Sequence, residues 1–177
     1  MSAQDSKLFV ISGPSGAGKG TLVTRVRERR SNLGLTVSAT TRAPRKGEVD
    51  GVNYFFLTRE EFDRRVANGE FVEWAEVHGN CYGTLVSEVT SKLASGASLI
   101  LEIDVQGALQ VKERFPEAVL IFIKPPSLEV LRERLVGRGT ETPETIELRM
   151  ANAADELALA DRYDDVVVND DLDRATD

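Results

Sequence analysis

Short apolar runs alternate with amphipathic stretches over most of this chain. Continuous apolar runs at residues 8–11, 98–103 and 119–123 are typical of strands covered on both faces, as in a parallel sheet. Each run is followed by a stretch with the apolar spacing of a helix, so the pattern predicts successive βα units. The helices predicted for these units span residues 19–30, 106–115, 128–137 and 143–162.

The pattern differs between residues 40 and 84. Residues 71–77 alternate apolar and acidic side chains, which predicts a half-buried strand. Thr58 and Glu61 form a capping box at the start of a helix that ends near Asn68. We therefore expect an antiparallel patch with one helix, inserted between two larger βα units. The other predicted elements are strands at residues 35–39, 52–56 and 165–168, a turn at Gly79-Asn80, a helix ending at Ser95 and a C-terminal helix beginning at Leu172.

Composition narrows the class of protein. The 177 residues carry a formal net charge of -7, which argues against a surface that coats nucleic acid. No apolar run approaches the roughly 20 residues of a membrane span, and the first residues lack the shape of a signal peptide. Cys81 is the only cysteine, which excludes an internal disulfide and fits a reducing compartment. We expect a cytoplasmic protein without a membrane, nucleic-acid or obligate protein partner.

The stretch GPSGAGKGT follows the first apolar run and opens the first predicted helix. Gly13, Gly16 and Gly18 let successive backbone N–H groups point at one anion, and the positive end of the helix faces the same point. Lys19 adds a mobile positive charge. In this context the G-x-x-x-x-G-K spacing predicts a phosphate site rather than a glycine-rich turn with a surface lysine. Gly20 stands where the motif usually carries Ser or Thr, which removes a hydroxyl ligand for Mg²⁺.

Two further groups of polar residues are candidates for chemistry. Arg42 and Arg45 lie three apart in a Ser/Thr-rich turn, and guanidinium groups match phosphate oxygens bidentately. A solvated basic loop fits this stretch equally well. Glu102 and Asp104 end a buried run, at the strand end where doubly wound sheets bind ligands. His78, the only histidine, is expected at a strand end in a structural role.

Because these motifs occur together and in order, the chain closely resembles the guanylate kinase family. The resemblance covers nearly the whole sequence and is far more specific than a phosphate loop alone. The matching stretches are GPSGAGKGT (13–21), SATTRAPRKGEVDGVNYFF (38–56), GEFVEWAEVHGNCYGT (69–84), LEIDVQGA (101–108), RLVGRGTET (134–142) and VNDDLD (168–173).

The resemblance implies an α/β fold. It combines a parallel P-loop sheet flanked by helices with an inserted mixed α/β subdomain that binds the nucleoside monophosphate, and with a small helical lid. On this basis we expect the P-loop core to comprise residues 1–39, 85–126 and 163–177. The GMP-binding subdomain would span residues 40–84, and residues 127–162 would form the lid and its adjoining helices.

The resemblance also implies how the chain would recognise GMP. Glu73 and Thr84 would read the base, because guanine offers N1–H and N2–H₂ to one carboxylate and its O6 to a hydroxyl. Adenine would leave these groups unpaired, and such a site rejects the wrong base strongly. From the alternation alone, Glu73 fits an outward position on an exposed strand face equally well. The phosphate of GMP would be held by Ser38, Arg42, Arg45, Tyr54 and Tyr82.

Magnesium would enter with ATP. Asp104, with Glu102 beside it, would contact GMP or the water shell of Mg²⁺, near Gly20 and Thr21. Family members often have Asp at the position of Glu102, so the resemblance says less about that side chain. No direct metal ligand is assigned.

ATP would be bound by the phosphate loop and by arginines from the lid and core. Arg149 lies on a long predicted helix, where an exposed ion pair with Glu144 or Glu147 is the alternative. The ATP-binding residues implied are Gly13, Pro14, Ser15, Gly16, Ala17, Gly18, Lys19, Gly20, Thr21, Arg134, Arg138 and Asn169, the last near adenine. The catalytic residues implied are Lys19, Arg42, Arg138 and Arg149.

The function expected from this resemblance is transfer of the γ-phosphoryl group of Mg-ATP to GMP, giving ADP and GDP. Two other functions remain open at this point. A guanylate-kinase-like module without catalysis would bind phosphorylated peptides at the GMP site, but such modules typically have degraded P-loops. A kinase for another monophosphate would share the P-loop and arginines and lack the pair Glu73 and Thr84.

Overall fold

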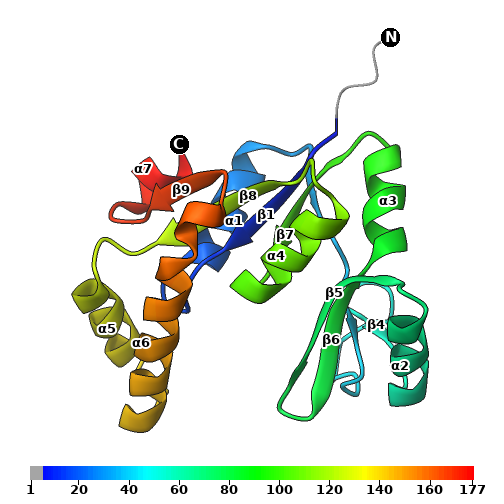
Figure 1. The fold of residues 1–177 in the computed structure, drawn as a ribbon, viewed down its shortest axis with the longest axis horizontal. Coiled ribbons are helices and arrows are strands. Elements are labelled where there is room, and N and C mark those ends of the chain that lie inside the picture. Colours follow the sequence, from blue (N-terminus) through cyan, green and yellow to red (C-terminus); the bar gives the residue numbers. More distant parts are fainter. Residues whose placement is uncertain (1–5) are drawn as a thin grey trace.

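A computed structural model describes residues 6–177 and contains two sheets (Figure 1). The first sheet has five parallel strands in the order β2-β7-β1-β8-β9. Its strands are β1 (Leu8–Ser12), β2 (Leu33–Leu35), β7 (Ser98–Glu102), β8 (Val119–Lys124) and β9 (Asp165–Val168). The parallel sheet flanked by helices that the sequence predicted is confirmed.

Alternating side chains of this sheet pack into two separate cores. Val10 of β1 belongs to the core shared with α3 (Val86–Ala94) and α4 (Val105–Arg114). Its neighbour Ile11 belongs to the core shared with α1 (Lys19–Arg29) and α7 (Leu172–Thr176). Burial on both faces explains why these strands are continuously apolar.

The second sheet has four strands in the order β4-β3-β6-β5. Its one helix, α2 (Arg59–Ala67), is capped by the Thr58 side chain, and Phe62 of this helix stacks on Phe71 with 4.4 Å between ring centroids. These contacts form a small core separate from the parallel sheet. The strands are β3 (Ala39–Thr40), β4 (Phe55–Phe56), β5 (Phe71–Val77) and β6 (Asn80–Leu85).

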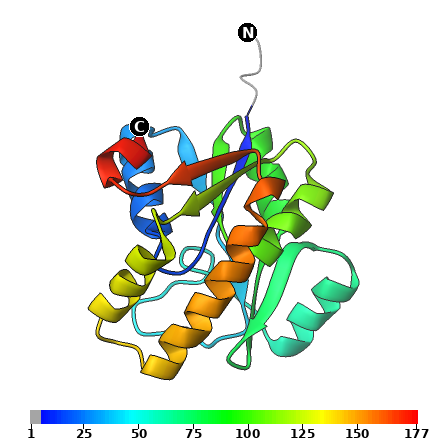
Figure 2. The ribbon, with the colours of Figure 1, turned by 60° about the vertical axis from the view of Figure 1, so that its left-hand side comes forward.

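Two helices form a third unit. The helices α5 (Leu128–Gly137) and α6 (Pro143–Ala158) start at the residues predicted, because Ser127 and Thr142 cap them and proline occupies the first position of α6. They share a small apolar core, and a short 3₁₀ turn, Ala160–Arg162, follows α6. This pair and the four-stranded sheet extend from the same side of the parallel sheet (Figures 1 and 2).

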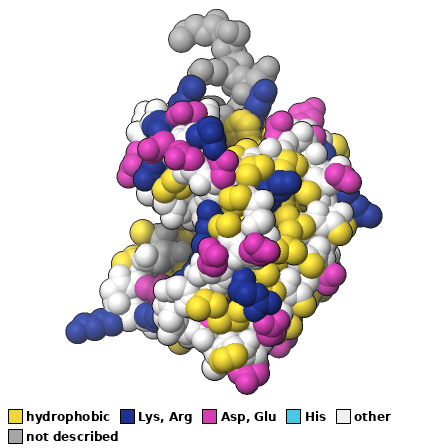
Figure 3. All heavy atoms as spheres, turned by 90° about the vertical axis from the view of Figure 1, so that its left-hand side faces the viewer, with side chains coloured by type: hydrophobic (Ala, Val, Ile, Leu, Met, Phe, Trp, Pro, Cys, Tyr) yellow, Lys and Arg dark blue, Asp and Glu magenta, His cyan; other side chains and the backbone are white. Residues whose placement is uncertain are grey.

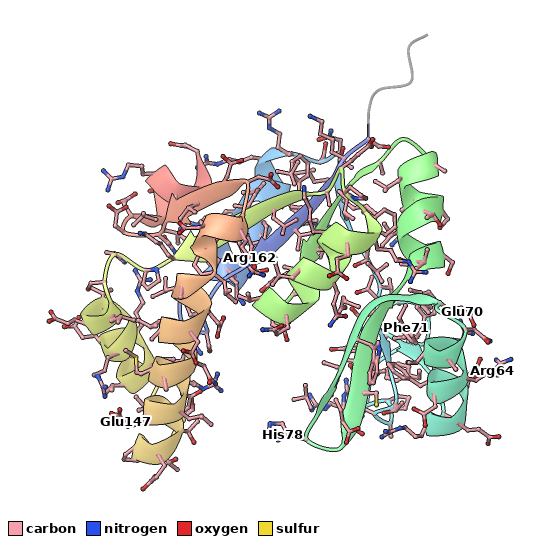
Figure 4. All side chains as sticks on the ribbon, in the orientation of Figure 1. Arg64, Glu70, Phe71, His78, Glu147 and Arg162 are labelled. Atoms are coloured by element: carbon pink, nitrogen blue, oxygen red, sulfur yellow. The ribbon has the colours of Figure 1, made fainter. Side chains whose placement is uncertain are left out.

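Two arms therefore border the carboxyl end of the parallel sheet. Figure 4 marks them by Glu147 on α6 and by His78 at the tip of the β5–β6 hairpin. His78 is exposed and has a backbone φ of 50°, as a tight hairpin turn requires. Its position at a strand end agrees with the prediction.

The strand predicted at residues 35–39 is wrong. The parallel sheet takes only Leu33–Leu35, and the second sheet takes Ala39–Thr40. Between them the chain leaves one sheet for the other, and the backbone N–H of Val37 donates to the Glu88 carboxylate at 2.9 Å. A side chain far along the chain thus replaces the ladder partner that a continuous strand would have supplied.

Three further expectations for the inserted region need correction. The strand predicted at residues 52–56 shrinks to Phe55–Phe56, because the chain before it forms a turn, in which the Asn53 side chain accepts from the backbone N–H of Val49. The Asp50 side chain accepts from the backbone N–H of Phe56. The strand β6 was not predicted, because its glycine interrupts the apolar pattern. Gly83 is buried there, and a Cβ on it would lie 2.8 Å from the Glu73 carbonyl oxygen. The patch is also mixed, since β3 and β4 are parallel.

The surface is mixed in character. An apolar cavity of about 600 Å³ lies between α1, α7 and the sheet. On the side of α5 and α6, apolar side chains gather in a band interspersed with charged ones (Figure 3). Within residues 6–177 no helix has the length and apolar character needed to span a membrane. The exposed large apolar side chains of α5, α6 and β9 are Leu128, Val136, Leu148, Val166 and Val168.

We expect Phe122→Ala to destabilise the fold by about 3–5 kcal/mol, the usual cost of truncating a fully buried aromatic side chain. Phe122 is 0% exposed in the centre of β8, and its ring packs edge-on against Tyr163 at 5.1 Å. Urea unfolding measures the change. The control Val166→Ala, at an exposed edge-strand position, should cost under about 1 kcal/mol. Equal losses for the two variants would contradict this account of the core.

Candidate active site

The loop between β1 and α1 forms a backbone cradle. Gly13 has a φ of 155°, and a Cβ there would lie 2.1 Å from the carbonyl oxygen of Ile123. Gly18 has a φ of 88° and caps α1 from a left-handed conformation. Residues with a Cβ do not take up these conformations without strain, so the predicted glycines are required by the backbone itself. The cradle opens at the N-terminus of α1, where the helix dipole favours an anion.

Lys19 lines a cavity of about 450 Å³ beside this cradle. Burial lowers the pKa of the Lys19 ammonium, while nearby carboxylates, with Glu102 the strongest, act in the opposite direction. The cavity is therefore a place where a buried cation faces negative charge. Its lining residues are Gly13, Ser15, Gly16, Gly18, Lys19, Gly20, Thr21, Glu102, Asp104, Arg138 and Glu156.

The long helix α6 contributes two side chains to the site. Arg149 donates through one terminal nitrogen to the Ser15 hydroxyl at 2.8 Å and pairs with Glu141, with 2.8 Å between Nε and Oε1. Of the alternatives that the sequence left for Arg149, an ion pair with Glu144 or Glu147 is wrong, because Glu147 pairs with Arg132. The structure thus brings Arg149 to the phosphate loop, as the resemblance implied.

Glu156 lies two helical turns further along α6 and was missed by sequence reasoning. Its carboxylate lines the cavity of Lys19 and is half-buried. Burial raises the pKa of Glu156, while Lys19 lowers it and Asp104 adds to the rise. The only signal in the sequence was its spacing of seven from Arg149, which places both residues on one helix face.

Asn169 and Arg134 lie behind the phosphate loop. The Asn169 side-chain amide donates to the Ala17 carbonyl at 2.8 Å, and its backbone carbonyl accepts from Arg134 at 2.8 Å. A Cβ on Gly18 would lie 2.4 Å from the same Asn169 nitrogen. Arg134 is thus engaged with backbone at the rear of the loop, whereas Arg138 lines the cavity in front. Of the three arginines expected at the ATP phosphates, Arg138 lines the cavity and Arg149 contacts the loop, whereas Arg134 does neither.

A carboxylate and a hydroxyl face one another on the four-stranded sheet. Glu73 of β5 is paired in register with Thr84 of β6, and the Thr84 hydroxyl donates to Glu73 Oε1 at 2.8 Å. Burial raises the pKa of the Glu73 carboxyl, Thr84 partly offsets the rise, and Asp104 adds to it. The outward position for Glu73 is therefore wrong, since its neighbour Trp74, at 42% exposure, takes the outward face.

Arg42 is held in place before any ligand arrives. Its guanidinium forms a bidentate pair with Glu48, at 2.9 and 3.0 Å, and lies 5.2 Å from the centroid of Tyr54. Tyr54 in turn packs edge-on against Tyr82 at 6.2 Å. The pair with Arg42 lowers the pKa of Glu48 to about 2. Half-buried and paired, Arg42 does not belong to a merely solvated basic loop.

The other predicted phosphate ligands are placed less tightly. Arg45 is exposed, and its backbone N–H donates to Glu48 at 2.7 Å. Ser38 is half-buried next to β3, where its carbonyl accepts from Phe55 at 2.9 Å. Glu48 was missed by sequence reasoning, because an acidic residue in a basic turn gives no sign of which arginine it will order.

The donor set fits magnesium carried by a nucleotide. Within residues 6–177, no group of three or more His, Cys, Asp and Glu side chains is placed to hold a metal ion by itself. Glu102 and Asp104 line the cavity, and Glu102 Oε1 lies 3.7 Å from the position of a Cβ on Gly20. Mg²⁺ usually keeps several waters and takes one or two carboxylates together with substrate phosphates. Two carboxylates beside a phosphate cradle match that requirement.

Comparisons of the sequence and of the structure with known proteins point to the same family. The sequence model of the family described as guanylate kinase matches residues 5–177. A guanylate kinase of Halalkalibacterium halodurans is 54% identical over 177 residues, which cover 100% of this chain and 87% of that protein. One of Gloeobacter violaceus is 59% identical over 94% of this chain and 82% of that protein. The crystal structure of guanylate kinase from Anaplasma phagocytophilum superposes with a TM-score of 0.71 at 37% identity, covering 98% of this chain and 81% of that one.

The Arg42–Glu48 pair predicts a specific dependence of stability on pH. Because the folded-state pKa of Glu48 is about 2 and its ordinary value is 4.5, its stabilising contribution is complete above pH 4.5 and is lost as the pH falls towards 2. Urea unfolding of wild type and Glu48→Gln should therefore differ by a constant free energy from pH 7 to 5. The difference should shrink between pH 4.5 and 3.

The matched control for this prediction is Glu113→Gln, at an exposed carboxylate without an ion pair in residues 6–177. Its difference from wild type should show no such decline. A Glu48→Gln difference that stays constant down to pH 3 would contradict the assigned pKa.

Proposed function

The chain belongs to the guanylate kinase family, whose members phosphorylate GMP with ATP, and from this premise we propose which of its residues carry each part of that reaction. The observation that carries the proposal is the pairing of Glu73 with Thr84, close to Asp104, which lines the cavity of Lys19. We assign residues 40–84 to GMP binding, residues 127–162 to the lid, and the remainder to the P-loop core. ATP and GMP are the proposed substrates, and the cytoplasm is the proposed location.

Glu73 and Thr84 read the base in this proposal. The Glu73 carboxylate accepts the N1–H and N2–H₂ of guanine, and the Thr84 hydroxyl turns from Glu73 towards O6. The half-buried position of Glu73 supports this role, because a desolvated carboxylate without its two donors is costly. Adenine presents a lone pair where guanine presents N1–H, and is rejected.

Arg42 and its neighbours hold the phosphate of GMP. Glu48 and the Tyr54 ring keep the Arg42 guanidinium in one orientation, so little side-chain freedom is lost on binding. Tyr54 and Tyr82 add hydroxyl donors from adjacent positions. Arg45 and Ser38 complete the set from either end of the segment.

The cradle holds the β- and γ-phosphates of ATP. Its backbone N–H groups and Lys19 bind phosphate oxygens, while Arg138 and Arg149 approach from the lid side. Thr21 supplies a hydroxyl to a phosphate. Asp104 and Glu102 would hold the Mg²⁺ of Mg-ATP through its waters, and the ion would supply positive charge to neutralise the transferred group.

The attacking group is an oxygen of the GMP phosphate. Its second ionisation lies near pH 6, so it is already largely deprotonated at neutral pH and requires no general base. The oxygen forms a bond to the γ-phosphorus as the bond to the β–γ bridging oxygen breaks, and ADP leaves. Lys19, Arg138 and Arg149 stabilise the charge that spreads over the transferred group. His78, at an exposed hairpin tip, takes no part.

The two arms provide the exclusion of water that such a reaction needs. The helices α5 and α6 and the four-stranded sheet border the same site from opposite sides (Figures 1 and 4). Their approach on binding both nucleotides would bring the arginines together and keep water from the γ-phosphate.

A direct test measures ADP release from Mg-ATP with GMP, AMP, CMP or UMP in separate reactions. Turnover with GMP alone supports the proposed base reading. Turnover with another monophosphate would keep the phosphate machinery and reject the assignment of Glu73 and Thr84. Absence of turnover with all four would favour a binding module, which titration with phosphorylated peptides would then reveal.

We expect Glu73→Gln to lower kcat/KM for GMP about 10²-fold, because a side-chain amide sets an NH₂ donor against the donors of guanine. The KM for ATP should change little. The matched control is Glu76→Gln on the same strand, where the side chain is exposed and pairs with Arg59 at 3.1 Å. Coupled ADP release measures both variants. A loss of less than about 3-fold for Glu73→Gln would remove it from base recognition.

We expect Lys19→Met to lower kcat by about 10²-fold or more, the usual cost of removing one group that stabilises transferring charge. GMP binding, measured by calorimetry, should stay close to that of wild type, because Lys19 lies at the ATP cradle. Lys7→Met, at an exposed residue just before β1, serves as the control. Near-normal turnover of Lys19→Met would be incompatible with its assigned role.

A further inference from the structure

Besides Thr84, the Glu73 carboxylate has a neighbour on the parallel-sheet core. The other oxygen, Oε2, lies against the first turn of α4, a helix of the parallel-sheet core. Asp104 caps this helix, and its Oδ1 accepts from the backbone N–H of Gly107 at 2.7 Å. A carboxylate of the four-stranded sheet and the carboxylate that caps α4 therefore meet at the same glycine.

The space above Gly107 is what allows this meeting. An ideal Cβ on Gly107 would lie 3.2 Å from Glu73 Oε2 and equally 3.2 Å from Asp104 Oδ1 and Ile103 Cδ1. Contacts this close require the neighbour to shift by a few tenths of an ångström. Of the two carboxylates, Asp104 is fixed by its cap hydrogen bond, so the end of the longer Glu73 side chain is the group that moves.

Backbone conformation does not explain why residue 107 is a glycine. Gly107 lies within α4 and has an ordinary helical backbone, where glycine is less favourable than alanine. It is buried, so exposure to solvent gives no reason either. Gly107 lowers the stability of the helix and lies next to Glu73, which is proposed to bind the substrate. This combination indicates that the position must leave space.

We propose that Gly107 is a specificity-determining position, which sets the selectivity for guanine by leaving room for the Glu73 carboxylate against α4. The inference rests on the proposed role of Glu73 as the reader of the base. Guanine needs both of its donors to reach one carboxylate, so recognition depends on the position of the Glu73 carboxylate to within a few tenths of an ångström. A methyl group at residue 107 displaces that carboxylate while leaving its charge unchanged.

The substitution should act on one substrate only. Gly107→Ala is expected to raise the KM for GMP and lower kcat/KM for GMP about 10-fold, with the KM for ATP within 2-fold of wild type. AMP should remain a non-substrate, so the loss is to be seen with GMP alone. The thermal midpoint should not fall, since alanine favours the helix.

Gln110→Ala is the matched control, one turn further along α4, with an exposed side chain that forms no hydrogen bond within residues 6–177. All its kinetic constants should match those of wild type. The decisive comparison introduces Gly107→Ala into the Glu73→Ala background. If Gly107 acts through Glu73, the second substitution should have less than a 2-fold effect on kcat/KM for GMP there.

Two results would overturn the inference. One is an undiminished effect of Gly107→Ala in the Glu73→Ala background, which would mark a structural role. The other is an unchanged kcat/KM for GMP in the single variant. If the proposed role of Glu73 is itself wrong, the result differs, because Glu73→Gln would then leave kcat/KM for GMP unchanged. If Glu73→Gln lowers kcat/KM for GMP and Gly107→Ala does not, the inference about Gly107 is rejected and the proposed role of Glu73 stands.

Discussion

The phosphate cradle keeps its shape because a buried amide holds it from behind. Asn169 donates to the Ala17 carbonyl from its side chain and to the Lys124 carbonyl from its backbone, and it accepts from Arg134. One residue at the end of β9 thus joins the cradle, a neighbouring strand and α5. A flexible glycine loop by itself would lose much conformational freedom on binding phosphate, and this anchoring removes part of that loss beforehand.

The two halves of the site are built by different means and meet at α4. In the proposed site, glycine geometry and a helix N-terminus form the side assigned to phosphate, so recognition there would rest on charge and shape. Ordered side chains form the other side, with Glu48 orienting Arg42 and Thr84 orienting Glu73. Asp104 and Glu73 lie close together at Gly107. The two halves of the proposed site therefore contact one another at the first turn of α4.

Much of this arrangement could be predicted from local sequence. The glycine spacing predicted the cradle, because Gly13, Gly16 and Gly18 have positive φ values within the loop itself. The helices α5 and α6 begin where residues 128–137 and 143–162 were predicted, because their caps, Ser127 and Thr142, act within four residues. The strands expected from the apolar runs at residues 8–11, 98–103 and 119–123 are confirmed, because burial on both faces leaves a continuous apolar run.

Features that depend on distant partners could not be predicted. Glu88 accepts from Val37 across 51 positions, and this contact accompanies the division of the strand expected at residues 35–39. Glu48 and Glu156 look like ordinary surface acids in the sequence and become site residues only when Arg42 and Lys19 are brought beside them. Asn169 was expected near adenine, and its buried amide contact with the phosphate loop had no local signal.

The length of α6 has a mechanical consequence. This helix of 16 residues packs against the main core through Leu157, contacts the loop between β1 and α1 through Arg149, and begins at Pro143, far from the parallel sheet. At about 1.5 Å per residue it is roughly 24 Å long. A rotation of roughly 10° about its core end would move its first residue by about 4 Å and Arg149 by about half that distance.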